Sequence, residues 1–126
     1  MNRKIQFRLV IIFAISVFMF SCKYEKIEPS NTLPENMSFQ NDIIPVFNQS
    51  CNTVGCHNEG GIPPDLSAAN AYVNLTTKDL IDLDFPENSL IYKRMTDVQS
   101  PMPINGVLDY ESKQVLSWIK DGAQDN

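Results

Sequence analysis

An apolar run, residues 9–20, stands near the start of the chain and follows a short basic stretch that ends at Arg8. The run is shorter than the roughly 20 residues that a membrane-spanning helix needs, and its length is typical of the hydrophobic region of a signal peptide. Ser21 and Cys22 follow it directly. The pattern therefore predicts that residues 1–21 form a targeting segment and do not belong to the folded domain.

The next stretch, residues 22–36, is polar and charged, with two prolines and only scattered apolar positions. A stretch of this composition cannot bury enough apolar surface to offset the entropy lost on ordering. We expect it to be a flexible tether. The remaining residues, 37–126, would then form one small domain.

Within residues 37–126, apolar positions recur at helical spacing in several short segments, and no strand-like alternation stands out. The segments with this pattern are 41–50, 68–74, 78–83, 88–94 and 109–121. Ser38 can cap the first segment, and Pro45 is tolerated only in the first turn of a helix, so this helix should begin near Asn41 or Asp42. It should end just before Cys51. The pattern predicts an all-α domain of short helices joined by loops.

The last segment is the strongest helix prediction of the chain. Asp109 is placed to cap it, and Gly122 is placed to end it. Val115 and Ile119 lie on the predicted inner face together with Leu116, and Trp118 should lie at the edge of that face.

The chemistry of the chain is concentrated in one loop, Cys51-Asn52-Thr53-Val54-Gly55-Cys56-His57, which contains the only histidine of the sequence. Two cysteines followed at once by a histidine resemble the attachment motif of c-type haem, here with a spacer of four residues in place of two. In that motif the two cysteines form thioethers to the porphyrin and the histidine binds the iron. The resemblance implies these roles for Cys51, Cys56 and His57, with one covalent haem c as the cofactor.

Two other interpretations compete for the same loop. A structural zinc site usually has four ligands, and this loop supplies at most three, from adjacent side chains that diverge. A disulfide between Cys51 and Cys56 is the stronger alternative, because the chain resembles an exported protein.

Several further positions are similar to those of small class I cytochrome c domains, in the same order along the chain. Phe47 lies four residues before the first cysteine, where that family has an aromatic residue packed on the C-terminal helix. Pro64 and Leu66 match a Pro-x-Leu element after the haem histidine. The resemblance implies that the Pro64 carbonyl accepts a hydrogen bond from the second ring nitrogen of His57, which would fix the ring.

Ser100-Pro101-Met102-Pro103 holds a methionine between two prolines, an arrangement that neither helix nor sheet accommodates. A Met-Pro loop leading into a final helix resembles the part of class I cytochromes that supplies the sixth iron ligand. Met102 is therefore predicted to be that ligand in preference to Met95, which is expected to fill space in the core. Lys93 and Arg94 are candidates to pair with the haem propionates, although basic residues at a helix end also favour the helix dipole.

The net negative charge of the chain argues against one class of partner. The chain has 10 basic and 15 acidic residues, and removal of the three basic residues of 1–21 leaves a formal charge of −8. Such a surface repels phosphate backbones, so nucleic acid is not an expected partner.

The order of a basic stretch, an apolar run and Ser-Cys resembles the signal of a bacterial lipoprotein. The resemblance implies lipid attachment at Cys22 and a domain in the cell envelope, in the periplasm or at the cell surface. Together, the patterns predict a membrane-anchored electron carrier with His/Met-ligated haem, acting with redox partner proteins. A haem enzyme such as a peroxidase and a haem-free, disulfide-bonded binding module remain as alternatives.

Overall fold

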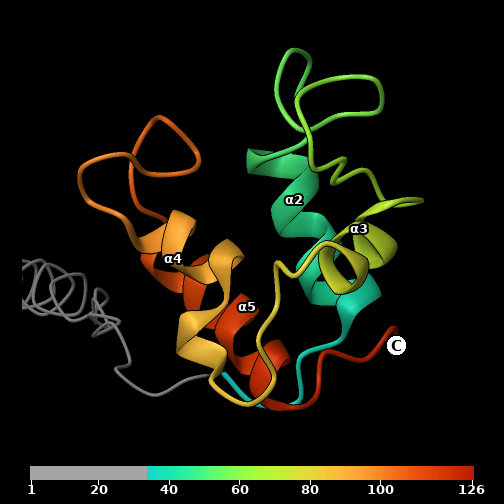
Figure 1. Cartoon of the computed structure of the whole chain (residues 1–126), viewed down its shortest axis with the longest axis vertical. Helices are drawn as coiled ribbons and strands as arrows, with labels where there is room; N and C mark the ends of the chain where they lie inside the picture. The colour runs from blue at the N-terminus through green and yellow to red at the C-terminus, as the bar shows by residue number, and fades with distance from the viewer. Residues whose placement is uncertain (1–33) are drawn as a thin grey trace, which may run out of the picture. The chain divides into compact units, whose positions relative to one another are not determined.

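The computed structural model of the chain describes residues 34–126, and all regular structure in this part is helical (Figure 1). The predicted targeting segment and the predicted tether up to residue 33, which includes Cys22, lie outside the described residues. The elements in chain order are η1 (Phe39–Ile43), α2 (Ile44–Ser50), α3 (Ala71–Thr77), η2 (Pro86–Asn88), α4 (Leu90–Thr96) and α5 (Asp109–Lys120). None of the described helices is both long and apolar enough to cross a membrane.

The helices are arranged with long loops between them. α4 packs against α5, and η1 packs against both α2 and α5. In Figure 1, α4 and α5 lie on one side of the described domain, α2 and α3 lie on the other, and the loops that follow α2 and α4 project at the same end. Side chains of α2 and α4 line a common cavity, which is described below.

The first helical segment begins earlier than the sequence predicted, at Phe39 instead of Asn41 or Asp42. Ser38 is the N-cap, as expected, and its hydroxyl oxygen accepts a hydrogen bond from the Asn41 backbone N–H at 3.2 Å. The first turn is a π-helix, η1, which runs directly into α2. Pro45 is the second residue of α2, so its missing N–H falls where the π-helical turn passes into the α-helix.

The predicted helix over 78–83 is wrong, and the helix predicted over 68–74 is displaced to Ala71–Thr77. Asp79 has a positive φ of 53°, which ends the helical path after α3. Further on, the carboxylate of Asp82 accepts hydrogen bonds from the backbone N–H groups of Asp84 and Phe85, at 3.1 and 2.8 Å. Side-chain acceptors of this kind compete with a helix for the same backbone donors. Residues 78–83 therefore form an irregular segment, named the strap below.

The terminal helix, α5, confirms the strongest prediction with two corrections. Gly122 follows it with a φ of 94°, as expected of a helix end. Asp109 is the first residue of α5 and not its cap, because Leu108 takes the cap position. Trp118 is buried and not at an edge; its indole N–H donates to the Gln124 carbonyl at 2.8 Å.

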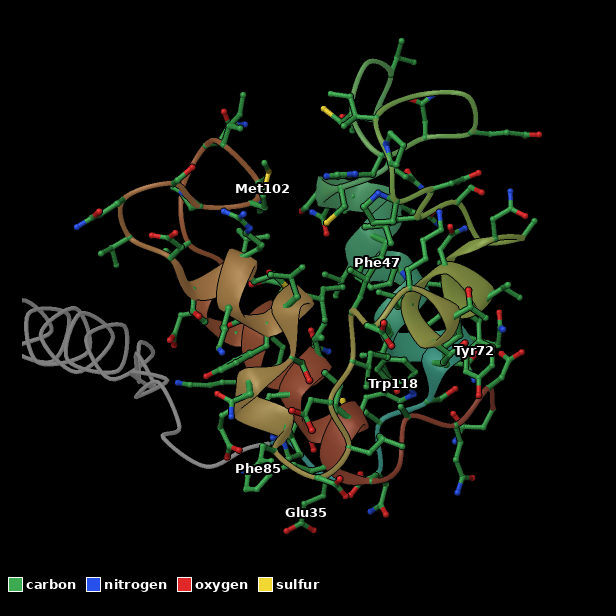
Figure 2. The ribbon with its side chains drawn as sticks, viewed as in Figure 1. Glu35, Phe47, Tyr72, Phe85, Met102 and Trp118 are labelled. Carbon is green, nitrogen blue, oxygen red and sulfur yellow. The ribbon has the colours of Figure 1, made fainter. Side chains whose placement is uncertain are left out.

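The core is centred on an aromatic residue that the sequence pattern did not single out. Phe39 is fully buried, and its ring centroid lies 4.9 Å from that of Trp118, 5.3 Å from Tyr72 and 6.5 Å from Phe47. Figure 2 shows the three partners of this ring, Trp118, Tyr72 and Phe47. Phe39 therefore joins η1 to α5, a contact that the family resemblance assigned to Phe47. Phe47 is also fully buried, and it lies between Phe39 and the cavity described below.

Candidate functional site

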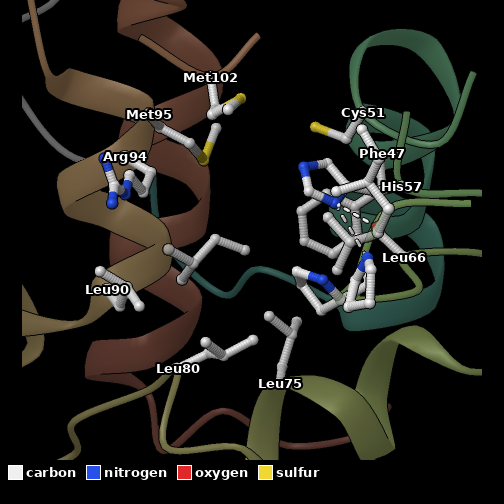
Figure 3. Close-up of a pocket in the computed structure, with 14 residues that line it drawn as sticks. Phe47, Cys51, His57, Leu66, Leu75, Leu80, Leu90, Arg94, Met95 and Met102 are labelled. Carbon is white, nitrogen blue, oxygen red and sulfur yellow. Dashed lines mark hydrogen bonds between the residues drawn. The ribbon is translucent and has the colours of Figure 1, made fainter. Parts of the chain in front are cut away.

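A cavity of about 370 Å³ lies between the loop that carries His57 and the α4 side of the domain. This volume falls in the range of about 300–1,000 Å³ that small-molecule and cofactor sites occupy. Figure 3 shows His57 and Cys51 on one wall, with Met95 and Met102 on the opposite wall. The residues that line the cavity are Phe47, Cys51, His57, Ile62, Pro63, Pro64, Leu66, Leu75, Leu80, Leu90, Ile91, Arg94, Met95 and Met102.

The His57 ring is held by two main-chain carbonyl groups. Its Nδ1 atom lies 2.9 Å from the Ile62 oxygen and 3.1 Å from the Pro64 oxygen. Because both partners only accept hydrogen bonds, Nδ1 must carry the proton, and in the neutral ring Nε2 keeps its lone pair. In Figure 3 the ring nitrogen without these contacts points into the cavity. The contact with Pro64 is the one that the family resemblance implied.

The loop around His57 is fixed by main-chain hydrogen bonds at short intervals. The N–H of His57 donates to the Cys51 carbonyl at 3.0 Å, and the His57 carbonyl accepts from the Leu66 N–H at 2.7 Å. The side-chain amide of Asn52 also donates to the Leu66 carbonyl, at 3.3 Å. Leu66 is buried and lines the cavity, so the predicted Pro-x-Leu element lies directly at the site.

Gly61 is required at the point where this loop turns back toward His57. A Cβ at this position would collide with the Cys56 carbonyl oxygen and would lie 2.6 Å from Oδ1 of Asn58. The Ile62 N–H donates to the same Cys56 carbonyl at 2.7 Å. A residue with a side chain at position 61 would therefore push apart the two segments of this loop. The carbonyl groups of Ile62 and Pro64, which accept from His57, would then shift.

The two cysteines of the motif have different surroundings. Cys51 is buried and lines the cavity, whereas Cys56 is half-buried and is not among the lining residues. Both are free thiols, so no disulfide joins them. Burial, with a smaller contribution from the charge of a nearby Cys56 thiolate, raises the pKa of the Cys51 thiol to about 11.

Both candidate methionines line the cavity opposite His57. Met95 lies in α4 and is only 2% exposed, within the hydrophobic core. Met102 lies in the loop after α4 and is 38% exposed. Its backbone N–H donates to the Arg94 carbonyl at 2.8 Å, which fixes the loop against the last turn of the helix. The structure thus brings two thioethers to the site and leaves the choice between them open.

The two basic residues at the end of α4 are not equivalent. Arg94 lines the cavity, whereas Lys93, which is next to it on the exposed surface, does not. Of the pair predicted to meet the propionates, the structure therefore brings only one to the site.

The apolar floor of the cavity was not predicted from the sequence. Leu75 and Leu80 come from α3 and the strap after it, and Figure 3 shows them below His57 and Met95. Leu75 lies one residue beyond the helix predicted over 68–74, and Leu80 lies in the segment whose helix prediction is wrong. A single-sequence pattern carries no signal that would have directed either side chain toward His57.

Groups of three or more histidine, cysteine, aspartate or glutamate side chains able to hold a metal ion are not found among residues 34–126. The side chains with possible ligand atoms that line the cavity are instead one imidazole, two thioethers and the thiol of Cys51. Comparison with known proteins gave no matching family model, no matching curated protein and no matching solved structure. The site must therefore be interpreted from its own chemistry.

Proposed function

We propose that the protein is a single-haem c-type electron carrier. The observation that supports this most directly is the position of His57. Its Nδ1–H is held by the carbonyls of Ile62 and Pro64, its free nitrogen points into an apolar cavity, and two methionine sulfurs lie on the opposite wall. One imidazole and one thioether on opposite sides of an apolar cavity are the donor set of a low-spin cytochrome c iron.

The residues present fit a covalent haem. Cys51 and Cys56 are free thiols in the loop that carries His57. Cys51 lines the cavity, and thioether attachment at Cys56 would require that side chain to turn toward it. The cavity is lined mainly by apolar side chains, which suits a porphyrin face and excludes water from the iron. When bound, the haem iron would alternate between Fe(III) and Fe(II) and so accept or release one electron.

The chain's own residues would then orient the haem and set its reduction potential. The carbonyls of Ile62 and Pro64 would keep the His57 ring in one orientation and increase its basicity. A methionine sulfur opposite favours the reduced iron and raises the potential. If His57 and one methionine both bound the iron, no position would be left on it for a substrate. Electron transfer to and from redox partner proteins is therefore proposed in preference to catalysis.

We also propose that the domain is anchored to a membrane of the bacterial cell envelope through a lipid on Cys22. This part of the proposal depends on the order of basic, apolar and Ser-Cys residues in 1–22. The net acidic composition of the chain argues against nucleic acid as a partner.

The decisive experiment is expression in a host with haem-attachment machinery, followed by denaturation. The polypeptide should keep its colour on a denaturing gel, and its mass should exceed that of the processed chain by one haem. The Cys51→Ala/Cys56→Ala double variant is the control and should lose covalent colour. A colourless wild-type product with a Cys51–Cys56 disulfide would contradict the proposal and support the haem-free binding module.

The spin state of the ferric iron distinguishes an electron carrier from a haem enzyme. A peroxidase would need an open sixth position and a distal base, and His57 is the only histidine in the sequence. A low-spin ferric spectrum that resists added peroxide supports the carrier. A high-spin spectrum with rapid reaction toward peroxide would support the enzyme.

A further inference from the structure

One charged side chain stands out in the cavity wall. The described residues that line the cavity are apolar or sulfur-containing, with His57 and Arg94 as the exceptions. Under the proposed function, His57 faces the metal. Arg94 is left as the charged group of the wall, and the proposed function assigns it no role.

Arg94 is connected to the Met102 loop through its main chain. Its carbonyl oxygen accepts the Met102 N–H at 2.8 Å, and Met95 is the next residue along α4. The side chain itself is exposed at the cavity wall, so its guanidinium can turn toward the cavity without leaving a buried contact. The main chain of Arg94 therefore holds the Met102 loop, while its charged side chain is free to change position.

Asp97 is an acidic side chain on which the charge of Arg94 acts, and the backbone already binds its carboxylate. The Asp97 carboxylate accepts hydrogen bonds from the N–H groups of Gln99 and Ser100, at 2.8 and 3.2 Å. These two bonds lower the pKa of Asp97, and the charge of Arg94 makes a smaller contribution in the same direction. Asp97 is thus held mainly by its own loop, and Arg94 remains able to bind another anion.

We propose that Arg94 is a positioning residue that binds the carboxylate edge of the bound group, a haem propionate under the proposed function, on which this inference rests. A carboxylate beside an otherwise apolar wall is costly unless it is paired and hydrogen-bonded. A guanidinium can bind both oxygens of a carboxylate in a planar fork. Lys93 has the same charge and is the adjacent residue, but it does not line the cavity.

The test uses the haem-loaded protein and compares Arg94→Gln with Lys93→Gln, a matched removal of one positive charge. Loss of a cation that neutralises a propionate leaves negative charge near the iron and favours Fe(III). Arg94→Gln should therefore lower the reduction potential, Lys93→Gln should change it less, and Arg94→Lys should restore most of the difference. The sulfur-to-iron charge-transfer band should persist in all three, because every substitution keeps the carbonyl that holds Met102.

Each other result overturns the inference. Equal shifts in Arg94→Gln and Lys93→Gln would show only a long-range charge effect. An unchanged potential in Arg94→Gln would show that the side chain binds no carboxylate, and loss of the charge-transfer band would show that it acts on the Met102 loop. Failure of the proposed function itself is distinguishable, because wild-type protein would then carry no covalent haem.

Discussion

The Nδ1 atom of His57 lies 3.1 Å from the carbonyl oxygen of Pro64, seven residues further along the chain. This contact orients the imidazole so that its other nitrogen faces the cavity, opposite Met95 and Met102 (Figure 3). The basicity of His57, the proposed iron ligand, therefore depends on the shape of the loop after it. This loop must turn back sharply to bring the Pro64 carbonyl beside the imidazole.

The turn at Gly61 should control the electronic character of His57. Gly61→Ala would force the added Cβ away from the Cys56 carbonyl and the Asn58 side chain, and the acceptors beside His57 would shift. Overpacking of this kind costs about 1–3 kcal/mol of unfolding free energy. Weaker hydrogen bonds to Nδ1–H make the imidazole a poorer donor to Fe(III), so the reduction potential should rise. Chemical denaturation and a redox titration measure the two effects.

Gly60→Ala is the control for that variant. Gly60 has a φ of 74° but open space around its Cα. An alanine there should cost about 1–2 kcal/mol through backbone strain alone and leave the potential in place. Equal potentials in the two variants would show that the Gly61 turn does not act through His57.

The sixth ligand should be Met102 and not Met95. Met102→Ala should abolish the sulfur-to-iron charge-transfer band, lower the potential and open the iron to added ligands. Met95 is buried in the core, so Met95→Ala should keep the band and lower the unfolding free energy by about 2–5 kcal/mol. Absorption spectra and denaturation curves of the two variants decide the assignment. Loss of the band in Met95→Ala would reverse the ligand assignment without affecting the carrier proposal.

Lipid attachment at Cys22 should be separable from the redox site. Cys22→Ala should release the domain from membranes and leave its absorption spectrum unchanged, because the residue lies outside the described domain. Fractionation of cells that express the variant measures this. A variant that stays in the membrane fraction would indicate that residues 9–20 remain as an uncleaved anchor.

The two motif cysteines should differ in reactivity when no haem is attached. The Cys51 thiol has a pKa raised from its ordinary value of 9.0 to about 11 by burial, so it stays protonated at pH 8. Alkylation followed by mass spectrometry should therefore modify Cys56 first, since the thiolate is the reactive form and Cys51 is also shielded. Equal rates at the two positions would show that Cys51 is not buried in this form.

The same pKa shift predicts a pH dependence of stability in the haem-free chain. The folded state holds the Cys51 proton more tightly than the unfolded state, so this contribution is complete below about pH 9 and is lost as the pH rises toward 11. Denaturation midpoints measured between these values should fall with pH. In a Cys51→Ala variant the decrease should be smaller.

Local features of the sequence predicted a large part of the helical structure. Ser38 caps the first helical segment, Gly122 ends α5, and the inner face of α5 is buried as its spacing indicated. These features depend on interactions within one or two turns, which a single sequence contains. The same local logic failed at 78–83, because Asp82 and Asp84 form side-chain and backbone contacts that the apolar spacing does not reveal.

The sequence by itself also located the candidate haem-binding residues. Cys51, Cys56, His57 and Pro64 belong to one loop, whose contacts join residues only a few positions apart. Only the tertiary structure decided what faces this loop. Packing of α4 against α5 brings Met95, Met102 and Arg94 to the opposite wall and leaves Lys93 outside. Neighbouring residues of a helix point about 100° apart, so which of them reaches a cavity depends on how the helix is rotated in its packing. That rotation is set by contacts distant in sequence, such as those of α5 with η1 through Phe39 and Trp118, and no local pattern contains it.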